Sequence, residues 1–200
     1  MVLSIVSFPT SAFPPIALGF FGLATGYLIY GPQELFHSPA RDEKVDLGTG
    51  IWGIWMPGFL QFLTGTYLFA GLAWFHSFSA GPLYMAALAF TAYGVHWFAI
   101  GYNRARGADP RPNGYMAIAF TAISILGAAV FFTAGDAGVG GLFIGLTLIY
   151  LSDIMATFKL GAAGMGERLL GFLHIGTGIW LLYLMFGVTL DFAVGAKWPI

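Results

Sequence analysis

The chain of 200 residues contains no cysteine, and charged residues make up only 8% of it. Without thiols it can form no disulfide, no thiolate metal site and no cysteine nucleophile. A soluble domain carries roughly a quarter charged residues, so this chain has too few to cover a water-facing surface. Its net charge of −1 gives no basis for binding nucleic acid. We therefore expect a membrane protein without a nucleic-acid partner.

Apolar residues are abundant and occur in long runs. Hydrophobic residues make up 58% of the chain, and 29 glycines accompany them, which is typical of transmembrane helices. The runs are too long and unbroken for the alternating strands, about ten residues each, of a membrane barrel. At about 20 residues a span, the sequence predicts an all-α, polytopic membrane protein with one domain, residues 1–200, and six transmembrane helices. The predicted spans are Pro15–Tyr30, Leu47–Trp74, Pro82–Tyr102, Tyr115–Thr133, Val139–Phe158 and Leu169–Phe192.

The polar segments between the spans predict an orientation. Residues Gly31–Asp46 read as a charged, turn-rich loop, and Met1–Pro15 has no basic region of the kind that opens a cleaved signal peptide. Seven of the eight lysines and arginines follow spans one, three and five, which by the positive-inside rule puts both termini outside the cytoplasm. These seven residues are Arg41, Lys44, Arg104, Arg106, Arg111, Lys159 and Arg168.

Three ionisable side chains fall inside predicted spans: His96, Asp153 and His174. An ionisable group in the hydrocarbon core is costly, so each is a functional candidate. His96 either senses protons or donates a hydrogen bond to a carbonyl of a neighbouring helix. Asp153 is either a proton carrier in a water-filled cavity or an interfacial residue, and His174 has the same two readings. We take the three as candidates for proton sensing.

Motifs of enzymes are missing from the sequence. The four histidines are scattered without metal-ligand spacing. The glycine-rich stretch Gly161–Gly166 lacks the Lys-Ser/Thr of a phosphate-binding loop, and no serine lies in a Gly-x-Ser-x-Gly turn. We therefore expect no catalytic residues, no metal and no cofactor. The sequence favours permeation over catalysis.

Five stretches resemble motifs of one known family, in the same order. Residues Phe90–Trp97 read Phe-Thr-Ala-Tyr-Gly-Val-His-Trp and are similar to Phe-Thr-x-Tyr-Gly-x-x-Trp in span three of that family. Pro14–Gly22 resembles its Asn-Pro-Ala-Pro-Leu-Gly-Leu, with the asparagine and the second proline replaced. Gly53–Gly65, Tyr183–Gly195 and Pro199–Ile200 are similar to its span two and its C-terminal region. The family is that of the acetate uptake transporters.

The resemblance implies a function and a set of pore residues. Members of this family pass acetate and related small carboxylates, as anion channels or by proton symport, through a pore in each six-helix subunit of a homohexamer in the lipid of the cell (inner or plasma) membrane. By position, the pore constriction corresponds to Leu23, Tyr93 and Leu146, where Leu23 replaces an aromatic residue. Family members have cytoplasmic termini, which is opposite to the orientation that the loop charges predict. The candidates for lining the pore or contacting substrate are Gln61, Thr91, Trp97 and Thr147. For Gln61, Thr91 and Thr147, an interhelical hydrogen bond is the alternative.

Two alternatives to carboxylate transport stay open. The stretch Asn103-x-x-x-Gly107-x-Asp109-x-Arg111 resembles the loop after span three of the acid-activated urea channel and its amide-channel relatives. Those proteins are also six-helix hexamers, and their termini lie outside, as the loop charges predict here. A non-transporting membrane scaffold or sensor is the third hypothesis. Continuous polar residues along an interior path would argue against it.

Overall fold

The computed structural model describes residues 15–199, and within that range all regular elements are helices, as expected for an all-α protein. The N-terminal segment without signal-peptide features, and the motif residues Pro14 and Ile200, lie partly or wholly outside the described residues. The helices are α1 (Ile16–Phe36), α2 (Glu43–Gly53), the π-helix η1 (Ile54–Phe59), α3 (Leu60–Ala73), α4 (Pro82–Arg106), α5 (Arg111–Thr133), α6 (Ala137–Thr157) and α7 (Met165–Val194).

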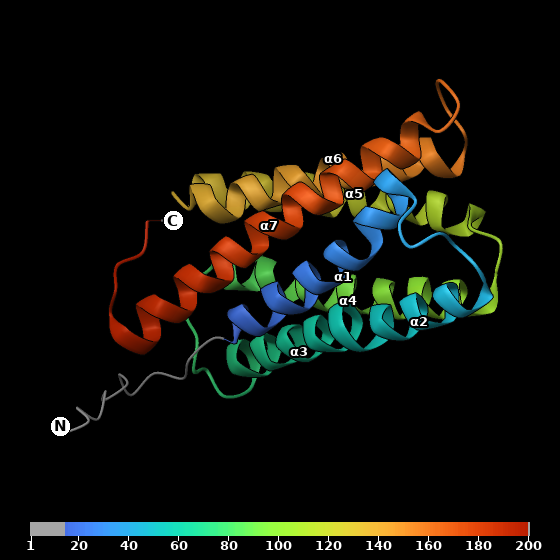
Figure 1. Cartoon of the computed structure of the whole chain (residues 1–200). Helices are drawn as coiled ribbons and strands as arrows, with labels where there is room; N and C mark the ends of the chain where they lie inside the picture. The colour runs from blue at the N-terminus through green and yellow to red at the C-terminus, as the bar shows by residue number, and fades with distance from the viewer. Residues whose placement is uncertain (1–14, 200) are drawn as a thin grey trace.

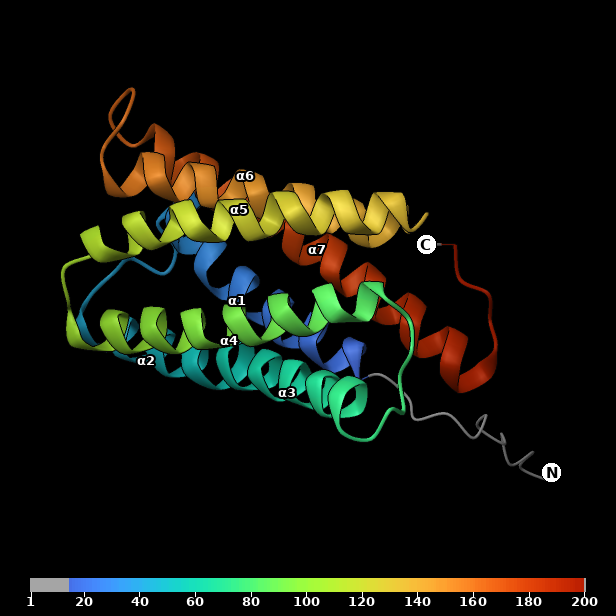
Figure 2. The same ribbon diagram turned by 180° about the vertical axis from the view of Figure 1, so that it is seen from behind.

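The helices form a closed ring. Successive helices run antiparallel and contact one another in the order α1, α3, α4, α5, α6 and α7, and α7 packs back against α1. In Figures 1 and 2, α5 and α6 lie along one side of the bundle, α2, α3 and α4 lie along the other, and α1 and α7 lie between them. The loops 37–42, 107–110 and 158–164 meet at one end of the bundle, which we call the charged end. The loops 74–81 and 134–136 meet at the opposite end.

One helical segment is continuous from α2 through η1 to α3. Pro57 lies in its middle and has no backbone N–H to donate, so an α-helical hydrogen bond is missing there. The chain widens into a π-turn at this point, and most π-helix in proteins takes this form of a short insertion in an α-helix. The side-chain amide of Gln61 donates to the carbonyl of Pro57 over 3.1 Å.

Glycines let this segment approach α4 closely. A Cβ atom at Gly50 would collide with the carbonyl oxygen of Gly101, and one at Gly65 would collide with Thr91. At Gly58 a Cβ atom would lie 2.8 Å from the ring of Phe98. The small residues therefore bring two backbones together, which is the packing expected of membrane helices.

The outer surface of the bundle is apolar. Large side chains such as Trp55, Phe172 and Phe186 are 55–63% exposed, whereas Gln61 and Ser124 are fully buried. Within the described residues, α4, α5, α6 and α7 are long and apolar enough to cross a bilayer. The chain is therefore a multi-pass membrane protein. The remaining segments differ from these four because α1 ends in polar residues and the α2–η1–α3 segment is divided at the π-turn.

The prediction that Gly31–Asp46 forms a loop is wrong. Helix α1 continues to Phe36, and α2 begins at Glu43 after Asp42, whose carboxylate accepts a hydrogen bond from the backbone N–H of Val45 over 2.8 Å. Only residues 37–42 lie outside the helices. Helices α4, α5 and α7 also extend beyond the predicted spans, so the loops at the charged end are short.

Candidate functional site

Two cavities lie inside the ring of helices. The first has a volume of about 220 Å³, and residues of the loops 37–42 and 107–110 contribute to its wall, so it lies toward the charged end. The second has a volume of about 230 Å³ and lies toward the opposite end, where Ala80 and Asp136 contribute to its wall. We call them the polar cavity and the apolar cavity, because ionisable and aromatic side chains line the first and mainly aliphatic and phenylalanine side chains line the second.

Only one helical turn separates the two cavities on three of the helices. Four residues along an α-helix correspond to a rise of about 6 Å. On each of these helices, one residue of the apolar cavity is followed four positions later by one of the polar cavity. The pairs are Leu23 and Tyr27 on α1, Tyr93 and Trp97 on α4, and Leu146 and Tyr150 on α6.

The three residues predicted for a pore constriction lie together on the wall of the apolar cavity. Leu23, Tyr93 and Leu146 are each 2–3% exposed. The hydroxyl of Tyr93 donates to Oγ of Ser124 over 2.9 Å, because Ser124 uses its own hydrogen to bond the carbonyl of Phe120 at 2.7 Å. Gln61, a predicted pore-lining residue, also lines this cavity, and its Oε1 atom is buried without a partner.

All three candidates for proton sensing, His96, Asp153 and His174, line the polar cavity. Nδ1 of His174 lies 2.6 Å from Oε2 of Glu34, and the side chains are only 8% and 13% exposed. The ring of Tyr27 stacks on the His174 imidazole with centroids 4.6 Å apart. Asp153 accepts a hydrogen bond from Thr157 in the next turn over 3.2 Å. Two carboxyl groups and two imidazoles thus share one cavity.

His96 lies where the polar cavity approaches the apolar cavity, three residues after Tyr93. Its Nδ1 atom lies 3.1 Å from the hydroxyl of Tyr150, and its ring packs on Phe120 with centroids 4.6 Å apart. Its Nε2 atom is buried and has no hydrogen-bond partner in the described part of the chain. Trp97, predicted to contact substrate, also lines this cavity, and its ring meets the ring of Tyr30 edge-on at 5.0 Å.

A network of hydrogen bonds holds the two arginines that line the polar cavity toward the charged end. Nε of Arg104 lies 2.6 Å from Asp46, and Nη2 donates to Oε1 of Gln33 at 2.6 Å. The Arg104 guanidinium also sits 5.4 Å from the ring centre of Tyr30, within the range of a cation–π contact. Arg41 binds the same Asp46 with two nitrogens, and this hydrogen bonding raises the pKa of the Arg41 guanidinium. Arg41 and Arg104 therefore already share an anionic partner, Asp46.

The loop that resembles the urea channels lies at the surface. Asp109 accepts hydrogen bonds from the side chain and the backbone N–H of Arg111, and these bonds lower the pKa of the Asp109 carboxyl to about 2. Neither residue lines the polar cavity, although Gly107 and Asn103 do. The pair at the start of α5 therefore orders an exposed loop.

Thr91 and Thr147 line neither cavity. Thr91 packs against Gly65 at the contact between α3 and α4, and its hydroxyl is buried without a partner. The hydroxyl of Thr147 donates to the carbonyl of Phe143 in its own helix over 2.8 Å. In this conformation neither side chain offers a donor to a solute in the cavities.

Sequence reasoning missed Tyr27, Tyr150 and Glu34 as cavity residues. Glu34 was assigned to a loop, although Tyr27, Tyr30 and Glu34 are spaced three and four residues apart, which puts them on one face of a helix. That spacing could have identified Tyr27 and Glu34 from the sequence. In residues 15–199, no three histidine or acidic side chains come close enough together to hold a metal ion.

Comparisons with known proteins agree with this architecture. No family model matches the sequence, and no curated protein is similar to it at a significant level. A solved structure, that of the bacterial acetate channel SatP, superposes with a TM-score of 0.73 over 94% of this chain and 98% of the SatP chain. The chain has the fold of a bacterial acetate channel. The sequence identity is 16%, so the likeness confirms the predicted resemblance to the acetate transporters at the level of the fold.

Proposed function

We propose that this protein is a channel or transporter that passes acetate and related small carboxylates across the cell membrane. The observation that carries the proposal is the pair of cavities at opposite ends of one ring of helices, with a barrier one helical turn thick between them. In this proposal, a side-chain movement at Tyr93, which lines the apolar cavity next to the barrier, joins the two cavities. This arrangement suits permeation better than a scaffold, which needs no interior path.

Two further observations favour a carboxylate as the solute. SatP, whose fold this chain shares over nearly its whole length, is described as an acetate channel. The polar cavity also contains tyrosine, tryptophan and histidine side chains, which are the kind of donors that a carboxyl group needs when it leaves water. The narrow aliphatic and aromatic barrier suits the short apolar end of the same solute.

The proposed protein is a single domain with six spans, residues 1–200, and six subunits form a homohexamer in which each subunit has its own pore. The closed ring supports a pore within each subunit, because both cavities are lined by helices of that ring. In Figure 1, α1 and the α2–η1–α3 segment run along the bundle beside the four apolar helices, which supports six spans in contact with lipid. The function is permeation and involves no catalytic residue, metal or cofactor.

Transport is proposed to be coupled to protons. His96, His174 and Asp153 face one cavity together with Glu34, and Arg41 and Arg104 lie nearer its mouth. These groups offer several sites where a proton can bind beside the solute path. We expect uptake of labelled acetate to rise as the outside solution becomes more acidic, and a flat profile would separate a simple anion channel from a symporter.

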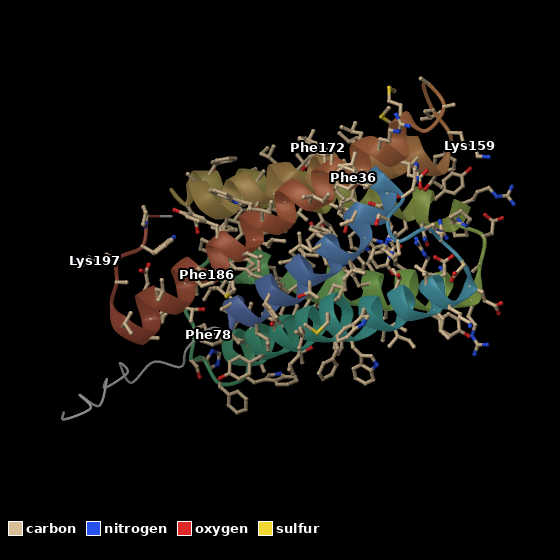
Figure 3. All side chains as sticks on the ribbon, viewed as in Figure 1. Phe36, Phe78, Lys159, Phe172, Phe186 and Lys197 are labelled. Carbon is tan, nitrogen blue, oxygen red and sulfur yellow. The ribbon has the colours of Figure 1, made fainter. Side chains whose placement is uncertain are left out.

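The loop charges support an orientation with the charged end in the cytoplasm. Figure 3 shows Lys159 at the charged end and Lys197 at the opposite end, near the end of α7. On this basis both termini lie outside, opposite to the orientation that the family resemblance implies. A protease-sensitive tag at the C-terminus, tested on intact and on opened cells, decides between the two orientations.

Uptake into liposomes tests the proposed function directly. The purified protein is reconstituted, and the entry of labelled acetate and labelled urea is compared with entry into liposomes without protein. Acetate entry that is saturable and exceeds the control supports the proposal. Entry of urea without acetate would make the protein an amide channel, and entry of neither would favour the scaffold.

A further inference from the structure

The hydrogen-bonded pair of His96 and Tyr150 has more hydrogens than it can use. A neutral imidazole carries one N–H and a phenol carries one O–H, but their single contact of 3.1 Å can contain only one hydrogen. Neither side chain has another hydrogen-bond partner in residues 15–199, and the Nε2 atom of His96 is fully buried. One donor of the pair is therefore left without an acceptor, which is unfavourable in a buried place.

Of the two possible arrangements of the pair, the one with fewer unpartnered atoms places the unpaired hydrogen on Nε2 of His96. When Tyr150 donates to Nδ1, only the Nε2–H group lacks a partner as a donor. When Nδ1–H donates to Tyr150 instead, both the phenol hydrogen and the lone pair of Nε2 lack partners. The first arrangement therefore leaves a single N–H group available, and Tyr150 selects that tautomer.

The imidazole is held rigidly at the border between the cavities. Its ring packs against Phe120 at 4.6 Å and against the ring of Tyr150 at 5.6 Å. Both members of the pair line the polar cavity, and the residues one turn away, Tyr93 and Leu146, line the apolar cavity. A donor in this position is oriented before any solute arrives, so little ordering is needed on binding.

Other charged groups of the polar cavity already have partners. Glu34 is bound to His174, Asp153 accepts from Thr157, and Arg104 is bound to Asp46. The cavity volume of about 220 Å³ far exceeds the roughly 15 Å³ needed for one water molecule. The cavity that His96 lines therefore has room for a small solute, and no group in the described chain uses its Nε2–H donor.

We propose that His96, oriented by Tyr150, is the binding site for the carboxyl group of the solute on the polar side of the barrier. The Nε2–H group donates to a carboxylate oxygen, or to the carbonyl oxygen of the protonated acid. This inference rests on the proposed function and assigns the place where the solute stops before it crosses the barrier. Sequence reasoning had placed His96 only among proton sensors or structural donors.

Four variants test the site by the half-saturation concentration, KM, for acetate uptake in liposomes. His96→Phe keeps a ring but removes the donor, so KM rises about tenfold to a hundredfold, the usual effect of losing a hydrogen bond to a charged group. His96→Gln keeps an N–H donor of similar reach and stays within a fewfold of wild type. Tyr150→Phe frees the tautomer and raises KM severalfold. His76→Phe, at an exposed histidine in the loop 74–81, leaves KM unchanged.

A second measurement covers the case in which a variant fails to fold. Wild-type protein with ¹⁵N-labelled histidine is titrated with acetate, and the Nε2 signal of one histidine shifts with saturation. That signal is assigned by its loss in His96→Gln or His96→Phe. An acetate-independent His96 signal, or a wild-type KM in folded His96→Phe, overturns the site while leaving the transport proposal intact. A wild-type protein that takes up no acetate overturns both.

Discussion

The two cavities have nearly equal volumes, about 220 and 230 Å³, but different chemistry. The polar cavity contains two histidines, two carboxyl groups, two arginines and three tyrosines, whereas Gln61, Tyr93 and Asp136 are the polar side chains on the wall of the apolar one. The same helices α1, α4 and α6 line both. The character of the path therefore depends on the position along a helix and changes within a single turn.

This abrupt change has an energetic meaning for the proposed solute. An ionised carboxylate that moves past His96 and Tyr150 leaves hydrogen-bond donors and enters a wall of leucine and phenylalanine. Burial of an unpaired charge is far more costly than burial of a neutral polar group. For the proposed solute, the border between the cavities therefore favours passage of the neutral acid. The ionisable groups of the polar cavity are placed where the carboxylate would take up the proton that makes it neutral.

The largest expected effect comes from filling the apolar cavity. Leu23→Trp places a bulky ring next to Tyr93 and Leu146, so acetate uptake should fall at least tenfold. Overpacking costs about 1–3 kcal/mol, which the neighbouring cavity reduces. Leu18→Trp on the outer face of the same helix, where Leu18 is 36% exposed, is the matched control and should transport normally. Equal uptake by both variants would remove the apolar cavity from the path.

Removing the aromatic part of the barrier should merge the cavities. Tyr93→Ala deletes a ring that stacks on Tyr150 with centroids 5.9 Å apart, and carboxylates bulkier than acetate should then enter liposomes several times faster than through wild type. The stability cost is about 3 kcal/mol or more. Tyr93→Phe loses only the bond to Ser124, about 1 kcal/mol, and should keep wild-type selectivity. Unchanged selectivity in Tyr93→Ala would exclude a gate at this position.

The polar cavity depends on a buried pair, which a double-mutant cycle can measure. His174→Gln and Glu34→Gln should each destabilise the protein, and the double variant should lose less than their sum, with a coupling of about 1–3 kcal/mol. Reversible unfolding in micelles provides the free energies. The exposed pair of Asp109 and Arg111 serves as the control and should show a smaller coupling, because solvent screens it. An absence of coupling between His174 and Glu34 would mean that solvent screens the polar cavity.

The smallest effect is expected at the threonines outside both cavities. Thr147→Val removes a hydroxyl that bonds its own helix, so acetate uptake should equal that of wild type. Thr91→Val removes a buried hydroxyl without a partner, so it should not lower the free energy of unfolding. A large drop in uptake in either variant would show that the path includes surfaces beyond these two cavities.

The helical architecture could be predicted because apolar runs of span length have few alternatives in a membrane. The region around Gln33 could not be predicted in this way. Polar residues there read as a loop, but Gln33 donates to Thr49 over 2.8 Å and accepts from Arg104, a partner 71 positions away. Tertiary hydrogen bonds thus stabilise a helix that local sequence argues against.

The candidate site was partly within reach of the sequence. The resemblance pointed to Leu23, Tyr93 and Leu146, which come together, because motif positions carry three-dimensional information. Thr91 and Thr147 were chosen for their hydroxyls alone, and residue type does not say which face of a helix meets a cavity. The pairing of Glu34 with His174 connects residues 140 positions apart, so only the fold could place them together.

The π-turn at Pro57 changes the phase of the helix in which it lies. Gly50, Gly58 and Gly65 all face α4, although the first interval is eight residues and the second is seven. At about 100° per residue, seven steps return to within 20° of the starting direction, whereas eight overshoot by about 80°. The wide turn accommodates the additional residue and so restores a seven-residue stripe. Deleting one residue between 54 and 59 would therefore give a regular α-helix whose glycines still face α4. Replacing Pro57 without a deletion, so that the π-turn becomes α-helix, would rotate one half of the segment away from α4.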